Sequence, residues 1–181
     1  TECDTDFVSR NSNFKEMSHK ILESICKNSN DHSEAHSILQ QWSVKFNEHL
    51  NFNHNYYDLS SKEQLSNSRL IKSLYGYPNN FCSHEKTTHV FGSVVSMISL
   101  EISSECLMSQ SNLYDLSDKI ARHIAAFQPT SINSLDSDSL MNQKWLYDEN
   151  VKVSDILQKD SGILVKSMIL ARLGKKTIVA S

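Results

Sequence analysis

The pattern of hydrophobic and polar positions predicts two amphipathic helices in the first third of the chain. Between Phe14 and Cys26, apolar residues recur at helical spacing: Phe14, Met17, Ile21, Leu22 and Ile25. Asn13, with Glu16 three residues later, resembles a capping box at the start of this helix. The second helix has a stronger stripe and two candidate caps, Asp31 and Ser33; the stripe consists of Ala35, Ile38, Leu39, Trp42, Phe46 and Leu50.

The later pattern alternates between helix and strand. Residues 61–75 have a weaker helical pattern that ends before Gly76. Residues 90–102 have the two-residue period of a strand, with Val94, Ile98, Leu100 and Ile102 on one face and Val95, Met97 and Glu101 on the other. Another amphipathic helix covers residues 113–127 before Pro129. A short helix at 154–159, with Ser154 as cap, and a strand at 163–171 complete the pattern.

The order of these elements indicates an α+β fold. Helices outnumber strands, and no regular crossover helices separate the strands as they would in a parallel α/β sheet. Residues 1–25 and 98–126 share the order strand, polar loop, amphipathic helix. We therefore expect two related lobes with small antiparallel sheets, the first over residues 1–80 and the second over residues 81–181.

Composition and charge exclude several classes of protein. The 181 residues include 18 Lys and Arg and 21 Asp and Glu, a formal net charge of −3. A polybasic surface for nucleic acid would need an excess of Lys and Arg, so we expect no direct nucleic-acid partner. The apolar runs are too short for a transmembrane helix, and we expect no membrane partner. Four cysteines without a CxxC pair favour reduced thiols over a disulfide framework.

Eight histidines raise the hypothesis of a metal site. His32 and His36 lie four residues apart on a predicted helix, a spacing that lets two imidazoles face one ion. Glu34 is out of register for an HExxH motif, and no other histidine is paired with a cysteine. A solvated helix face is the better interpretation, and a metal-binding helical interaction module that uses Cys26 with these two histidines is the alternative.

The sequence contains no motif for covalent or nucleotide-dependent catalysis. It has no GxSxG, GxxxxGK[ST] or GxGxxG pattern, and only four glycines in all. Asp136 and Asp138 form a candidate acid pair, but in a Ser-rich loop they more simply solvate the chain. We therefore predict a protein that is not an enzyme and needs no cofactor.

The segment Thr5-Asp6-Phe7-Val8 is unusual because it places a large aromatic residue beside a carboxylate in the turn before the first helix. In such a turn, Phe7 is either a core anchor or an exposed aromatic residue for a partner's pocket. Because most Phe side chains are buried, the residues alone favour the core position by about two to one.

The run Cys-Asp-Thr-Asp-Phe-Val-Ser-Arg-Asn at residues 3–11 closely resembles the signature of elongation factor Ts, the guanine-nucleotide exchange factor of elongation factor Tu. Phe14 supplies the aromatic residue that follows this signature. Residues 120–129 are similar to the family's Ile-Ala-x-His-Ile-Ala-Ala-x-x-Pro helix. Residues 143–148 and 153–157 resemble its Gln-Pro-Phe-x-x-Asp and Val-Gly-x-Leu-Leu segments.

The resemblance implies a mechanism for nucleotide exchange in translation elongation. Phe7 would insert as an apolar wedge between helices of GDP-bound elongation factor Tu, and Asp6 would help to disturb the magnesium site that holds GDP. Loss of the metal removes the largest positive charge beside the phosphates, so the affinity for GDP falls. The partner-binding residues implied in this way are Thr5, Asp6, Phe7, Val8, His84 and His123.

The resemblance supports a contact role less strongly for the two histidines in this set than for the signature residues. His84 takes the place of the His in the family's Tyr-x-His-Gly turn, although Glu85 replaces the Gly. His123 lies beside the apolar stripe of its helix, where packing and partner contact are about equally expected.

The sequence also departs from the family pattern. We expect a core region without the family's N-terminal three-helix module, and a family strand at residues 65–80 is predicted to be missing. Low Gly and Ala content and the Trp145–Asp148 segment resemble animal mitochondrial members, which implies the mitochondrial matrix. An inactive fragment that keeps the signature without exchange activity is a further alternative.

Overall fold

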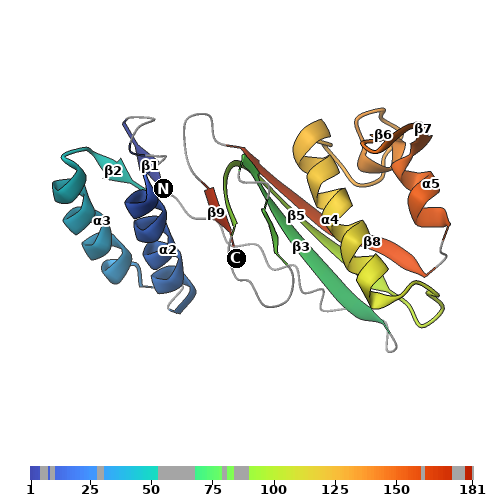
Figure 1. The fold of residues 1–181 in the computed structure, drawn as a ribbon, viewed down its shortest axis with the longest axis horizontal. Coiled ribbons are helices and arrows are strands. Elements are labelled where there is room, and N and C mark those ends of the chain that lie inside the picture. The colour runs from blue at the N-terminus through green and yellow to red at the C-terminus, as the bar shows by residue number, and fades with distance from the viewer. Residues whose placement is uncertain are drawn as a thin grey trace.

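The computed structural model has an α+β fold, as the sequence predicts (Figure 1). A pair of helices packs together at the N-terminal end, and an antiparallel sheet with further helices on one face forms the rest (Figure 1). The structure describes residues 1–4, 8, 11–27, 31–52, 68–78, 81–83, 90–159, 162–172 and 178–180.

The two predicted N-terminal helices are confirmed as α2 (Ser12–Lys27) and α3 (Ser33–Phe46). Their facing sides bury an apolar cluster of Val8, Phe14, Met17, Ile21, Ala35, Leu39, Trp42, Leu50 and Phe52. Helix α3 is shorter than its stripe suggested because Asn47 adopts a left-handed conformation with φ 52° and ends it. Leu50 then lies in β2 (Leu50–Asn51), which pairs antiparallel with β1 (Glu2–Cys3).

The predicted capping box at the start of α2 is wrong. Asn11, not Asn13, supplies the capping oxygen: its Oδ1 accepts from Asn13 N–H at 2.9 Å. Glu16 instead forms an ion pair with Lys20 one turn later, at 2.8 Å. At the start of α3, Asp31 Oδ1 accepts from the N–H of Ser33, the first residue of the helix, at 2.9 Å.

The main sheet has five strands in the described part of the chain. Its order is β4 (Phe81–Ser83), β3 (Arg69–Pro78), β5 (Val90–Ile102) and β8 (Ile163–Arg172), and β9 (Ile178–Ala180) pairs with the start of β5. All the pairings are antiparallel. The strands predicted at 90–102 and 163–171 are therefore confirmed.

The helix predicted over residues 61–75 is wrong where the structure describes it, because residues 69–78 form strand β3. This strand pairs with β5 from Arg69 opposite Ile102 to Pro78 opposite Gly92. Leu70-Ile71 and Leu74-Tyr75 are apolar pairs four residues apart, so they satisfy a helical period as well as a strand. Pairing with β5 along nearly all of β3 favours the strand over the helix, so a strand is present within residues 65–80, where a strand is predicted to be missing.

The two faces predicted for β5 are confirmed. Val94, Ile98, Leu100 and Ile102 pack in the main core, whereas Val95 and Met97 pack with Leu74 on the opposite face. Glu101 is buried on the strand, where its carboxylate pairs with Lys166 Nζ at 2.8 Å and accepts from the Ser68 hydroxyl at 2.7 Å. The ion pair and the hydroxyl offset the cost of burying this charge.

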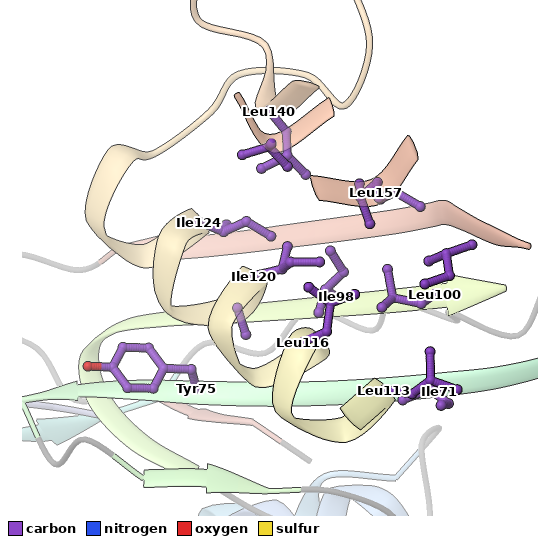
Figure 2. Close-up of a cluster of buried hydrophobic side chains, with 14 of the residues drawn as sticks. Ile71, Tyr75, Ile98, Leu100, Leu113, Leu116, Ile120, Ile124, Leu140 and Leu157 are labelled. Carbon is purple, nitrogen blue, oxygen red and sulfur yellow. The ribbon is translucent and has the colours of Figure 1, made fainter. Parts of the chain in front are cut away.

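Helix α4 (Gln110–Phe127) covers one face of the sheet and confirms the helix predicted at 113–127. Leu116, Ile120 and Ile124 of α4 pack in one cluster with strand residues that include Ile98 and Tyr75 (Figure 2). Small hydroxyl residues allow a close approach: Ser73 and Ser117 Oγ lie 2.7 Å apart, and Ser96 donates to the Ala121 carbonyl at 2.5 Å.

A smaller group of elements follows α4 and closes the end of the core. These are η1 (Leu140–Asn142), β6 (Lys144–Trp145), β7 (Asp148–Lys152) and α5 (Val153–Gln158). The short predicted helix is confirmed as α5, but Ser154 is not its cap. The Asp155 carboxylate accepts from the Lys152 N–H at 2.8 Å instead.

The described residues form two main apolar clusters. The first ends at Phe52, and the second begins at Ile71. The predicted lobe boundary at residue 80 stays a prediction, and β3 and β5 pair across it within one sheet.

Candidate partner-binding surface

Four of the six predicted partner-binding residues, Thr5, Asp6, Phe7 and His84, lie outside the described residues, so their roles stay predictions. Val8 is described and only 5% exposed, within the α2–α3 cluster. Its carbonyl accepts from the Asn11 N–H at 3.0 Å. Val8 therefore ties the end of the signature to the start of α2 through packing and a backbone hydrogen bond.

His123 is fully buried on α4 and has a hydrogen bond on each ring nitrogen. The Leu146 N–H donates to Nδ1 at 3.3 Å, which makes Nδ1 an acceptor. Nε2 lies 2.9 Å from Gln143 Oε1 and, carrying the ring proton, donates to it. The two partners together assign the neutral Nε2–H tautomer.

The surroundings of His123 favour this neutral form. Burial lowers the pKa of the imidazole below its ordinary value, and the hydrogen bond to Gln143 opposes that shift more weakly. A neutral ring is also what the Leu146 N–H requires, because a protonated Nδ1 would present a donor to a donor.

The imidazole ring lies in an aromatic stack. Its centroid is 4.7 Å from the Phe127 ring and 5.4 Å from the Trp145 ring, with interplanar angles of 23° and 24°. Tyr147 packs in a tilted arrangement on Trp145 at 5.3 Å, and Lys119 Nζ lies 5.8 Å from the Tyr147 ring centroid. Helix α4 and the β6–β7 hairpin are thus joined through stacked rings, of which His123 and Trp145 are buried.

Three large apolar side chains around this stack are exposed. The exposed fractions are 47% for Phe127, 40% for Leu146 and 48% for Tyr147, whereas Trp145 between them is buried. We call Phe127, Leu146 and Tyr147 the aromatic surface. Single exposed apolar residues are ordinary, whereas a group of them marks a candidate protein-binding site.

Comparison with known protein families decides the class of protein. The sequence matches the family described as Elongation factor TS over residues 4–139, which is well over half of the chain. The chain belongs to the elongation factor Ts family. Members of this family are nucleotide exchange factors for elongation factor Tu in translation elongation and are not enzymes. A comparison with curated proteins found no match.

Sequence reasoning missed most of the aromatic surface on this elongation factor Ts chain. Residues 143–148 were recognised only as part of the family resemblance, without a contact role. The available signal was the run Trp145-Leu146-Tyr147 between polar residues, because a short strand cannot bury three consecutive large side chains on one side.

The hypothesis of a metal-binding module gains no support from the described residues. Within them, no group of three or more His, Cys, Asp or Glu side chains is placed to hold an ion. The His36 ring lies 5.0 Å from the Phe52 ring, which is a packing contact. In the same part of the elongation factor Ts chain, no helix is both long and apolar enough to cross a membrane.

Proposed function

We propose that the aromatic surface is a docking contact for elongation factor Tu, and that the signature residues promote GDP release from that partner. The observation that carries the docking contact is the exposure of Phe127, Leu146 and Tyr147 around a buried His123–Trp145 stack. Aromatic residues on a rigid base bind partners at a low cost in side-chain entropy. Family membership supplies the identity of the partner.

In this proposal, the signature acts on the nucleotide site of the partner. Phe7 inserts as an apolar wedge, and Asp6 weakens the hold of the partner on the magnesium ion beside GDP. With the ion lost, the charge of the phosphates is poorly neutralised and GDP leaves faster. Thr5 and His84 are further contacts, and Val8 supports the signature because its side chain is anchored in the α2–α3 cluster.

The proposal gives the two predicted lobes separate contacts. The signature lies in the first lobe, over residues 1–80, and the aromatic surface lies in the second, over residues 81–181. We place the protein in the mitochondrial matrix, where it would act on the mitochondrial elongation factor Tu. Low Gly and Ala content and the Trp145–Asp148 segment, both similar to animal mitochondrial members, support this location.

Truncation of the aromatic surface tests the docking contact. Leu146→Ala and Tyr147→Ala should each weaken binding to GDP-bound elongation factor Tu by about tenfold or more, as loss of an interface anchor does. Leu164→Ala is a matched control, because Leu164 is 55% exposed but lies on β8 outside the surface. Calorimetry or interferometry measures the affinity. Wild-type affinity in both surface variants would contradict the proposal.

A further inference from the structure

We infer that Gln143 is a positioning residue that holds the aromatic surface in the arrangement that binds elongation factor Tu. The inference rests on the function proposed above. Gln143 directly follows η1 and precedes β6, and its side chain lies between α4 and the loop that leads into η1. It does not belong to the surface; it acts on the surface through His123 and Phe127.

Both the oxygen and the nitrogen of the Gln143 side-chain amide form hydrogen bonds. Oε1 accepts from His123 Nε2–H at 2.9 Å. The amide nitrogen donates to the carbonyl of Phe127 at 3.4 Å and to the carbonyl of Asp138 at 3.3 Å. The Gln143 backbone carbonyl also accepts from the Val153 N–H at 3.1 Å, at the start of α5. One residue therefore links α4, the preceding loop and α5.

The bond to His123 determines where the imidazole proton resides. A neutral imidazole has two tautomers, and an acceptor at Nε2 selects the Nε2–H form. Only that form leaves Nδ1 able to accept from the Leu146 N–H. Without the Gln143 acceptor, the Nδ1–H tautomer becomes competitive and places a donor against the Leu146 N–H. The Leu146 N–H then loses its acceptor, and the turn at Leu146 and Tyr147 is no longer held to His123 on α4.

The bond to the Phe127 carbonyl fixes the other side of the surface. Phe127 is the last residue of α4, and Gln128 after it adopts a left-handed conformation with φ 51°. The last carbonyls of a helix have no partner within the helix, so a side-chain donor at this point orders the final turn. Gln143 thus acts on both halves of the aromatic surface, one through His123 and one directly.

The test compares two variants of Gln143 with a matched control. Gln143→Met keeps the approximate length of the side chain and removes both hydrogen-bonding ends. Gln143→Asn keeps an amide but shortens its reach by one methylene, and serves if the Met variant fails to fold. Asn142→Leu is the control, because the neighbouring Asn142 amide donates to the carbonyls of Ser134 and Asp136 without touching His123.

Two readouts separate positioning from general stability. The first is the affinity of the folded, full-length chain for GDP-bound elongation factor Tu. It should fall about tenfold in the Gln143 variants, the size expected for loss of one hydrogen bond, and stay near wild type in Asn142→Leu. The second is the ring ¹⁵N chemical shifts of His123, which should move from the Nε2–H pattern towards a mixture of tautomers only in the Gln143 variants.

The outcomes distinguish this inference from the proposed function. Wild-type affinity in the Gln143 variants, or a loss of affinity with unchanged His123 shifts, would overturn the role of Gln143 while the effect of Leu146→Ala stands. Wild-type affinity in Leu146→Ala and Tyr147→Ala would contradict the docking surface itself and overturn the role of Gln143 with it.

Discussion

At the level of single residues, His123 combines full burial, a defined tautomer and a place in an aromatic stack. Its ring cannot touch a partner directly while α4 and the β6–β7 hairpin hold their arrangement. Any effect of His123 on exchange therefore passes through Leu146 and Phe127, which are exposed. The sequence leaves both packing and partner contact open for His123, and its burial in the free protein corresponds to packing.

Burial of His123 predicts a stability that depends on pH. The imidazole pKa is lowered in the folded state from 6.5, so the unfolded chain binds this proton more readily. Buried, neutral His123 should therefore contribute fully to the free energy of unfolding above about pH 6.5. This contribution should be lost as the pH decreases from about 6.5 towards the folded-state pKa. Urea unfolding of wild type between pH 7.5 and 5.0 measures it. His123→Gln removes the titration, and an identical pH dependence in both proteins would contradict the account.

We expect substitutions of the signature residues Phe7 and Asp6 to have different effects. Phe7→Ala should weaken binding to elongation factor Tu by at least about 2 kcal/mol, roughly thirtyfold, as loss of an aromatic anchor does. Asp6→Ala should lower the rate of stimulated GDP release more than it weakens binding, because its proposed action is on the magnesium site. Stopped-flow fluorescence of labelled GDP, together with thermal unfolding, checks both. Unfolding caused by Phe7→Ala, or unchanged GDP release with Asp6→Ala, would argue against the wedge.

The sequence could identify the signature but not the role of Gln143. The signature is a contiguous run of nine residues, so its pattern is visible along the chain. The contacts of Gln143 instead bring together His123, Phe127 and Asp138, which come from two other segments of the chain. A hydrogen-bond network of this kind depends on tertiary packing, which hydrophobic periodicity does not report.

At the level of elements, the helices and the long central strand follow directly from their hydrophobic periods. The α2, α3 and α4 stripes and the two faces of β5 were predictable because each pattern fits one period clearly. Strand β3 was not, since its apolar pairs fit both periods and its long pairing with β5 decides the outcome. Helix caps were less predictable, because Asn11 and Asn13 are equally good capping residues by type.

Close approach at the start of β8 gives an element-level prediction. The carbonyl of Gly162 accepts from the Ser103 N–H at 2.8 Å, and a Cβ at position 162 would lie only 2.5 Å from the backbone nitrogen of Cys106 and 2.7 Å from its Cα. Because backbone atoms cannot move aside as a flexible side chain can, Gly162→Ala should destabilise the fold by about 1–3 kcal/mol. Urea unfolding measures the change in stability. Unchanged stability would mean that the backbone of the β5–α4 connection can shift at little cost in free energy.

At the level of the whole molecule, the signature precedes helix α2 in the sequence, whereas the residues of the aromatic surface come from the end of α4 and the turn between β6 and β7. Figure 1 shows α2 at the N-terminal end of the molecule and α4, β6 and β7 at the other end. In the proposed function, both contacts act on elongation factor Tu. An inactive family fragment that keeps the signature would instead leave GDP release at its spontaneous rate. Exchange activity is therefore the property that separates these possibilities.

The most direct test is the rate of GDP release from mitochondrial elongation factor Tu preloaded with fluorescent GDP, followed after addition of excess unlabelled GDP. The account predicts that the wild-type chain accelerates release in proportion to its concentration until the complex saturates, and that Phe7→Ala lowers this acceleration. A folded wild-type chain that leaves the release rate at its spontaneous value would contradict the central claim.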